Sequence, residues 1–475
     1  MERRRAFCQA SIFAGPLAAA HASVALGTAT IAWFETASRC WTVRPIGAFR
    51  FVTFRLIWCS SLASAGAQWI ERIATSWLAL QTSGGPLGVG VVLAARMLPS
   101  LLLGIAVGAV ADRADRRRVL MMVALSGAIF AVALGALVRL GSIAFWQVVL
   151  FSFLGGCIQV SDTPARQALV VDSVDRAAGH NAIALNAVAS RLFGAVGAFV
   201  GGIIIPTFGV ASCYGVVATS YLVGLLLLAR ADPRAAKPVT PIVHPPFRRA
   251  VADAGRLILT HRAVRTLVLA AVACEIFGFS YMTVVPTFAQ DVLRAGAEGY
   301  GAMSAASAIG ATLAVLIIAS LPGTIRREPL LAAVYLVYGL ALLALASTPN
   351  LTTALLAMLV IGACASAFDT FQQTLIQFAV PDDQRGRAVG IWVFSIGTAP
   401  VGHLEVGVLA ATVGAPAALL VNGALVVLGA VTLAVQAPVY RWQRVLHVHE
   451  RLSAFAEPHS APDKGNSGVT PEPPP

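Results

Sequence analysis

The chain has 475 residues, of which 57% are hydrophobic and only 12% are charged. Soluble domains carry about 25% charged residues, so this composition excludes an ordinary soluble protein and predicts an integral membrane protein. A helix of about 20 apolar residues crosses the hydrocarbon core of a bilayer. Twelve such windows follow one another along the chain, at 56–80, 87–111, 119–138, 143–161, 182–206, 210–229, 264–288, 300–321, 329–346, 351–378, 388–412 and 416–437.

The formal net charge of +12 is distributed unevenly between the loops. The loops on one side hold eighteen Arg and Lys residues, in the segments 112–118, 162–180, 230–265, 322–328 and 381–387. The loops on the other side hold only Arg139 and Arg294. By the positive-inside rule, this asymmetry predicts a multi-pass protein with both termini in the cytoplasm. The basic charge therefore indicates topology, and no nucleic-acid partner is expected.

A polar gap after the sixth window divides the chain into two halves. We expect an interfacial or disordered extension at 1–50, because a further span there would conflict with the charge pattern. The basic, proline-rich segment 230–263 is predicted to be a cytoplasmic linker between two six-helix bundles, at 51–229 and 264–437. The polar tail at 438–475 is predicted to be disordered and cytoplasmic. The seven cysteines form no CxxC or Cys/His cluster, so no metal site is expected.

Two opposite charges are predicted inside the first bundle. Glu71 and Arg96 both lie about ten residues from the short outer loop 81–86, so they reach a similar depth and can pair. A charge at mid-bilayer costs about 3 kcal/mol, so both side chains should face the bundle interior. They form either a structural ion pair or part of a functional pathway.

The fifth window combines a charge with small residues. Arg191 lies well inside this helix and has no neighbouring acid in the sequence, which makes it a second candidate for the pathway. Gly194, Gly197, Gly201 and Gly202 follow at spacings that let helix backbones approach closely. We therefore interpret the glycines as packing positions.

The second half weakly repeats the first. A shift of 207 positions superposes Asp162 on Asp369 and Gln68 on Glu275, and a shift of 209 places Arg117 and Arg118 on two further arginines, Arg326 and Arg327. Because these matches coincide with the topological repeat, they support two six-helix units related by an axis along the membrane normal.

Three ionisable residues lie within the second half. Glu275 is predicted near the middle of the seventh helix, and His403 and Glu405 lie in the eleventh. Two residues apart on a helix is about 200°, so His403 and Glu405 cannot both face one cavity. An intramembrane Glu is a candidate functional site, whereas a lone His can also make a helix-to-helix hydrogen bond.

A charged turn, GAVADRADRRR, separates the second and third windows. Its Gly108, Asp112 and Arg113, with Arg116 and Arg117 beyond them, resemble the loop signature of the major facilitator superfamily. Asp115 departs from that signature, since a second glycine is more usual there. The resemblance covers roughly residues 50–437 and implies an all-α membrane fold of twelve transmembrane helices in two pseudo-symmetric bundles.

Within the superfamily, the chain most resembles bacterial exporters of the enterobactin-exporter and transmembrane-secretion-effector type. The segments that carry this resemblance are 68–72, 77–78, 96–99, 162–167, 181–186 and 381–387. The fifth helix departs from the drug-exporting members, because Gly197-Ala198 stands where they usually have Gly-Pro. Coupling residues are therefore not transferred from those members.

The resemblance implies a gate at the charged turn. Asp112 would pair with arginines, or meet a helix N-terminus, when the cytoplasmic side is closed, and these contacts would break when it opens. Helix 11 and Asp162 or Arg166 are the expected neighbours. The gating group is therefore Gly108, Asp112, Arg113, Arg116, Arg117, Asp162 and Arg166. The substrate or proton pathway group is Glu71, Arg96, Arg191, Glu275, Asp369, His403 and Glu405.

The energy source is predicted by exclusion. Only two lysines occur, Lys237 and Lys464, and neither follows a GxxxxG motif, so the chain lacks a Walker A phosphate loop. A proton gradient, with no cofactor, is the default, and Glu275, Glu405 and Glu71 are candidate carriers together with His403.

We expect a monomeric, proton-coupled exporter of a drug-like molecule or siderophore in the bacterial inner membrane. An importer of a small nutrient and a non-transporting membrane sensor or scaffold are the alternatives, and an enzyme is not expected.

Overall fold

The computed structural model describes residues 47–111, 115–175, 178–232, 255–322, 326–380 and 385–456, of which 103–111, 180, 385–387, 389 and 437–456 are described by their backbone alone. This part of the chain is helical and contains no strand. The predictions for most of the extension, for most of the linker and for the end of the tail lie outside the described residues. Asp112 and Arg113 of the charged turn also lie outside them.

The first half forms a bundle of six helices after a short 3₁₀ turn, η1 (Gly47–Arg50). The six are α3 (Val52–Ser83), α4 (Pro86–Ala111), α5 (Arg116–Arg139), α6 (Phe145–Asp172), α7 (Gly179–Phe208) and α8 (Val210–Arg230). Helix α3 packs against α7 and α8, α4 packs against α6, and α5 packs against α8. Tight turns such as the one at Gly84, which has a positive φ of 71°, keep successive helices antiparallel.

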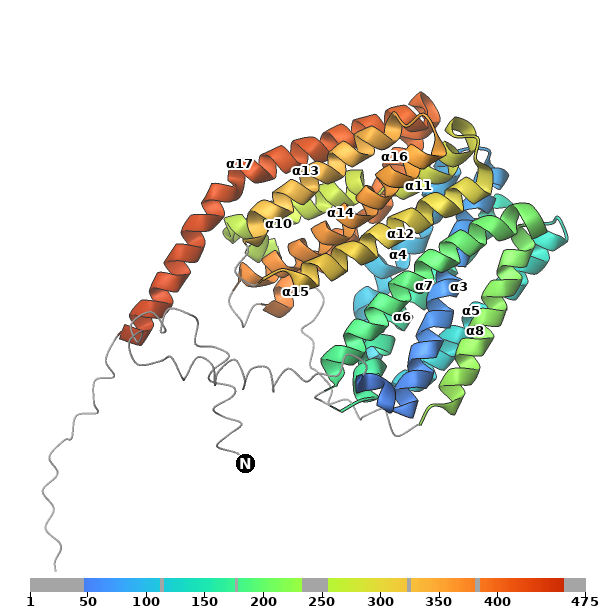
Figure 1. Ribbon diagram of the computed structural model, residues 1–475, viewed down its shortest axis with the longest axis horizontal. Coiled ribbons are helices and arrows are strands. Elements are labelled where there is room, and N and C mark those ends of the chain that lie inside the picture. The colour runs from blue at the N-terminus through green and yellow to red at the C-terminus, as the bar shows by residue number, and fades with distance from the viewer. Residues whose placement is uncertain are drawn as a thin grey trace, which may run out of the picture.

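The second half repeats this arrangement with interrupted helices. Its elements are α10 (Arg262–Ala273), η3 (Cys274–Gly278), α11 (Tyr281–Thr287), η4 (Phe288–Val292), α12 (Gly296–Ser320), α13 (Arg327–Ala346), α14 (Leu351–Phe378), α15 (Arg385–Ile396), α16 (Ala399–Val413) and α17 (Ala415–Ala456). The π-helical segments η3 and η4 flank α11, so the predicted seventh helix is irregular along its length. Figure 1 shows the two bundles as neighbouring groups of roughly antiparallel helices.

The described residues include ten helices that are long and apolar enough to span a membrane. The remaining predicted spans correspond to α3 and α4. Helix α3 has 32 residues, or about 48 Å at 1.5 Å per residue, but its polar positions keep it out of that set. The part of α4 that qualifies as apolar, 86–102, is shorter than the other spans. The all-α membrane fold is confirmed, while the count of twelve spans and the exact domain boundaries stay predictions.

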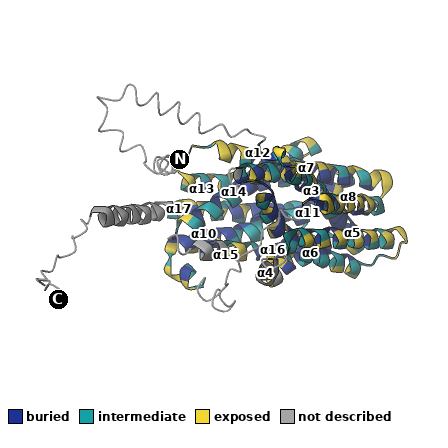
Figure 2. Cartoon of the chain, turned by 90° about the horizontal axis from the view of Figure 1, so that it is seen from below, coloured by how far each residue is buried: buried dark blue, intermediate teal, exposed yellow. Residues whose placement is uncertain are grey.

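Large apolar side chains lie on the outer faces of the helices. Met122, Leu226 and Leu356 are each about 60% exposed, and Figure 2 shows exposed positions along the periphery with buried ones toward the middle. Water would make such extensive apolar exposure unfavourable, whereas a lipid environment accommodates it.

Glycines permit close approach both within and between the bundles. A Cβ on Gly197 would lie 2.6 Å from the carbonyl oxygen of Gly66 in α3, which confirms the predicted packing role of the α7 glycines. Between the bundles, a Cβ on Gly202 would lie 2.7 Å from the Cα of Gly301 in α12. On α4, a Cβ on Gly90 would lie 2.4 Å from the carbonyl oxygen of His403 in α16. The last two contacts lie toward the helix ends opposite the charged turn, so the bundles are closed on that side.

Candidate functional site

A cavity of about 590 Å³ lies between the two bundles. It is lined by α3, α6 and α7 from the first bundle and by α12, α14 and the start of α11 from the second. The lining residues of α6 come from its last turns and those of α7 from its first half, so the cavity extends from the middle of the molecule toward the side of the charged turn. Small-molecule sites commonly measure 300–1,000 Å³, so the cavity is large enough for such a ligand.

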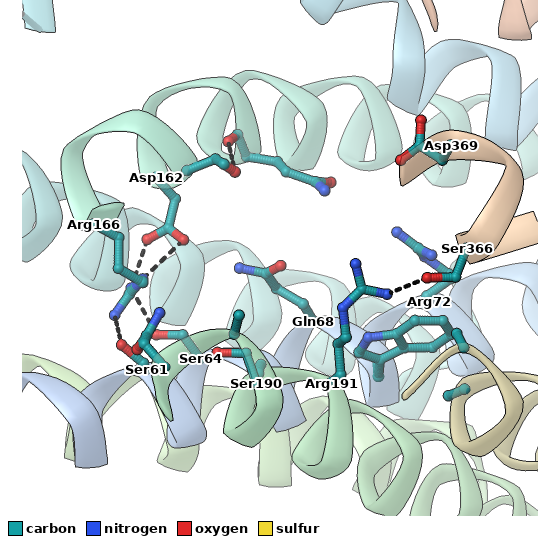
Figure 3. Close-up of a pocket in the computed structure, with 18 of the residues that line it drawn as sticks. Ser61, Ser64, Gln68, Arg72, Asp162, Arg166, Ser190, Arg191, Ser366 and Asp369 are labelled. Atoms are coloured by element: carbon teal, nitrogen blue, oxygen red, sulfur yellow. Dashed lines mark hydrogen bonds and ion pairs between the residues drawn. The ribbon is translucent and has the colours of Figure 1, made fainter. Parts of the chain in front are cut away.

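A closed polar network forms one wall of this cavity. Asp162 and Arg166, one turn apart on α6, pair with an Oδ1 to Nη2 distance of 2.6 Å. Arg166 also donates to the hydroxyls of Ser61 (3.3 Å) and Ser64 (3.0 Å) on α3. Figure 3 shows these four side chains directed toward one another. Both charged residues are more than 90% buried. The hydrogen bonds to the two serines help to offset the cost of removing this ion pair from water.

A second polar group crosses the cavity between the bundles. Arg191, near the middle of α7, donates from Nη1 to the hydroxyl of Ser366 on α14 at 3.1 Å. Asp369 lies one turn further along α14, and it interacts electrostatically with Arg191 and also with the side chain of Trp392. Figure 3 shows Arg191, Ser366 and Asp369 on the same side of the cavity. Among the described residues, no acid lies within 4 Å of the Arg191 guanidinium. The predicted pathway residues Arg191 and Asp369 are thus brought together.

The sequence-based prediction missed Arg72. Its guanidinium lies 4.7 Å from the ring centroid of Trp69, in a cation–π contact, and Arg72 lines the cavity with Tyr281 and Ser307. It makes no hydrogen bond or ion pair with the described residues. The helical geometry of the sequence could have indicated this position. Arg72 is about 100° around the helix from Glu71, so the two side chains face different surroundings.

Glu71 and Arg96 pair as predicted, but away from the cavity. The distance between Glu71 Oε1 and Arg96 Nη1 is 3.0 Å, and only 3% of the Arg96 side chain is exposed. A Cβ on Gly155 of α6 would lie 3.0 Å from the Glu71 carboxylate, so the small residue makes room for the pair. The location within the first bundle favours the structural interpretation of this pair.

The described part of the charged turn connects the start of α5 to the ends of α6 and α8. Asp115 caps α5 by accepting hydrogen bonds from the backbone amides of Arg117 (3.0 Å) and Arg118 (3.4 Å), so the departure from the family signature has a structural role. Arg116 pairs with Asp172 at the end of α6. Arg117 donates to the last carbonyl oxygens of α8, at 2.8 and 2.7 Å.

This arrangement differs from the expected gate in one respect. Within the resolved side chains, the turn contacts α6 and α8, whereas Asp162 and Arg166 bind each other and α3. Gly108 lies near the end of α4, where only the backbone is described. The gating role of the turn stays a prediction, since Asp112 and Arg113 lie outside the described residues.

The three candidate carriers of the second bundle lie outside the cavity lining. His403 Nδ1 lies 2.9 Å from the hydroxyl of Thr283, which is the helix-to-helix hydrogen bond considered above. Glu405 accepts from Asn422 of α17 at 3.2 Å, so Glu405 and His403 face different neighbours, as predicted. Glu275 belongs to η3 and interacts electrostatically with Asp369, but it makes no hydrogen bond or ion pair with the described residues.

No group of three or more His, Cys, Asp or Glu residues that could hold a metal is present in the described residues. The cavity therefore offers charged and hydroxyl groups for non-covalent binding. These groups can bind a ligand or exchange protons with it.

The family model of the transmembrane secretion effectors matches residues 43–465. The chain belongs to this family. It is thus a transporter of the major facilitator superfamily, a multi-pass membrane protein with a small-molecule substrate and not an enzyme.

Relatives and solved structures agree with this assignment. The Staphyloferrin A transporter of Staphylococcus aureus is 24% identical, over 73% of this chain and 86% of that relative. The multidrug efflux pump Tap of Mycolicibacterium fortuitum is 24% identical, over 76% and 89%. A structure of the nucleoside transporter NupG matches with a TM-score of 0.67 at 14% identity, covering 81% of this chain and 99% of NupG. A bacterial homologue of the lysosomal transporter Spinster, in an inward-facing conformation, matches with a TM-score of 0.57 at 17% identity, covering 82% and 96%. The structural matches show the fold.

Proposed function

We propose that the chain exports a small amphipathic compound from the cytoplasm across the bacterial inner membrane, driven by proton entry. The observation that carries the proposal is the cavity between the bundles, which extends toward one side while the other side is closed by backbone contacts. Transport by alternating access requires this asymmetry and its reversal. The positive-inside rule identifies the open side as cytoplasmic, with both termini on that side.

The relatives support the class of cargo. One is named for a siderophore and another for multidrug efflux, so a siderophore or a drug-like compound is the proposed substrate. The mixture of serine hydroxyls, charged groups and aromatic rings in the cavity suits an amphipathic molecule. No cofactor is required in this proposal, and the active unit is a monomer.

Proton coupling is assigned to two acids of the second bundle, Asp369 and Glu275. Asp369 lines the cavity, and Glu275, one turn before the cavity residue Phe279, interacts with it electrostatically. An acid without an ion pair can gain and lose a proton as the cavity changes sides, whereas an acid fixed in a pair resists this change. Glu275 also lies in a π-helical segment, and such segments occur frequently at functional sites.

Flux into or out of proteoliposomes tests this proposal. Purified protein is reconstituted with an imposed pH gradient, and a panel of dyes, antibiotics and catechol siderophores is followed. We expect proton-dependent transport of at least one compound. In Glu275→Gln the rate of this transport should fall by roughly tenfold, which corresponds to a free energy within the typical coupling range of about 1–3 kcal/mol. Glu405→Gln is the matched control, because Glu405 faces α17, and it should retain coupling. Equal loss in both variants would contradict the assignment to Glu275.

Two other functions follow from different outcomes. Import of a small nutrient would reverse the direction of coupled flux, because the fold alone does not fix direction. A membrane sensor or scaffold would show no flux for any compound and would retain a protein partner through the linker or tail. Growth of a deletion strain on candidate nutrients, together with pull-down by the 230–263 segment, separates these cases.

A further inference from the structure

Two arginines at the inner part of the cavity, Arg72 and Arg191, form no ion pair within 4 Å among the described residues. The Arg72 guanidinium lies over the face of Trp69 and makes no hydrogen bond with the described residues, and Arg191 uses one donor on Ser366. A guanidinium has five N–H donors, so most of the donors of both side chains remain available. Arginine within a membrane-spanning helix is costly unless it faces a partner or an aqueous cavity. Packing alone therefore does not account for these two side chains.

Both guanidinium groups reach the same region of the cavity. Arg72 projects from α3 and Arg191 from α7, and Figure 3 shows both beside Ser366 of α14. The third arginine of the lining, Arg166, is different because Asp162 and two serine hydroxyls already engage it. A ligand therefore finds free cationic donors only at the Arg72 and Arg191 end of the described lining.

The charge balance selects the class of anion. The described lining contains three arginines and two aspartates, which leaves one positive charge when both aspartates are ionised. A single carboxylate neutralises this charge, whereas a doubly charged phosphate would leave an excess of negative charge. Planar guanidinium groups also match the geometry of a carboxylate through paired hydrogen bonds.

The neighbouring side chains suit the rest of such a molecule. Trp69 and Tyr281 line the cavity near Arg72, Phe279 belongs to the same lining, and all three provide aromatic surfaces. These surfaces favour an apolar or aromatic body attached to the charged group. We propose that the cavity binds organic monocarboxylates, with the carboxylate held between Arg72 and Arg191 and the body packed on the aromatic residues. This inference rests on the proposed role of the cavity as the transport site.

Matched ligand pairs test this proposal. Binding of naphthylacetate and a panel of larger arylalkanoic acids to the full-length purified protein is measured by calorimetry, each beside its own primary amide. The amide has nearly the same shape but no charge. Charge-assisted hydrogen bonds contribute about 1.5–3 kcal/mol, so at least one acid should bind roughly tenfold or more tightly than its amide. If no acid in the panel exceeds its amide, the proposal is wrong.

Variants locate the effect. Arg72→Gln and Arg191→Gln should each reduce the preference for the acid over its amide, and thermal unfolding of the purified variants shows that they are folded. Arg191→Lys keeps the charge and should restore part of the preference. Arg139→Gln, an exposed position at the end of α5 outside the cavity, is the matched control and should bind like the wild type. An unchanged acid preference in both cavity variants would contradict the assignment.

Equilibrium binding is independent of the direction and coupling of transport. Selective acid binding without proton-dependent flux would refute the proposed function and leave this inference standing. Proton-dependent flux of amines or neutral compounds, with no acid preferred over its amide, would refute the inference and leave the function standing.

Discussion

Asp162 and Asp369 occupy corresponding positions in the two bundles, yet their surroundings differ. Asp162 on α6 pairs with Arg166 one turn later, at 2.6 Å. The position that matches Arg166 on α14 is Gln373, so Asp369 has no arginine of its own helix to pair with. Asp369 instead interacts with Arg191 from the opposite bundle. The same residue type is therefore fixed in one half and left to respond to the cavity in the other.

The second buried pair follows the same pattern. Glu71 and Arg96 bind each other inside the first bundle, whereas the corresponding positions of the second bundle are Gly278 and Met303. Glu275 stands where the first bundle has Gln68, and it makes no ion pair with the described residues. We infer that the paired acids of the first bundle, Asp162 and Glu71, hold helices together, and that Asp369 and Glu275 of the second bundle are available for proton exchange.

Removing one partner of a first-bundle pair should have the largest effect. Glu71→Gln leaves Arg96 buried without a counter-charge, which costs about 3–5 kcal/mol when a buried pair is broken. We expect a clear loss of thermal stability, measured by unfolding of the purified protein in detergent. Replacing Arg96 by Met in the same variant should recover part of the loss. Wild-type stability of the single variant would show that the pair does not hold the bundle.

The equivalent change in the second bundle should affect transport instead. Asp369→Asn removes an acid that forms no ion pair with the described residues, so thermal stability should stay close to that of the wild type. Proton-driven flux should fall by roughly tenfold, in the range of a typical coupling free energy. Flux and unfolding are measured on the same preparation. A large loss of stability with normal flux would reverse the comparison between the bundles.

A smaller effect is expected when the second bundle is given the arginine it lacks. Gln373→Arg places a guanidinium four residues after Asp369, as Arg166 follows Asp162. An i,i+4 pair contributes about 0.3–1 kcal/mol, so proton-driven flux should fall by roughly two- to fivefold as Asp369 becomes fixed. Gln373→Met is the control for side-chain length and should retain more flux. Equal flux in the two variants would contradict the expected pairing.

Hydropathy and charge predicted the features that depend on position along the chain. The helices follow the twelve apolar windows closely, and the depth of Glu71 and Arg96 predicted their pairing. The spacing of the α7 glycines predicted close packing, as Gly197 against α3 shows. These predictions succeed because a bilayer constrains helix length and the placement of charge strongly.

Features that depend on the rotation of one helix relative to another were harder to predict. Arg191 and Ser366 are 175 positions apart, so no local pattern indicates their contact. Arg72 was not predicted as a site residue, although its neighbour Glu71 was. The distance of a residue from the helix end does not reveal which face of α3 meets the cavity. The Asp162 and Arg166 pair was accessible from its i,i+4 spacing, but the family resemblance favoured contacts with the charged turn instead.

Because the cavity has a net positive charge, the membrane potential affects the loaded and the empty steps of the cycle differently. With a monocarboxylate bound as proposed, the described lining and its ligand carry no net charge, so reorientation of the loaded protein is insensitive to voltage. In the proposed cycle the empty protein returns with a proton on Asp369, so the described lining carries two positive charges, which move inward. A potential that is negative inside favours this return by up to about 2.3 kcal/mol per elementary charge per 100 mV. The empty-cavity arginines thus place the voltage dependence of export on the resetting step.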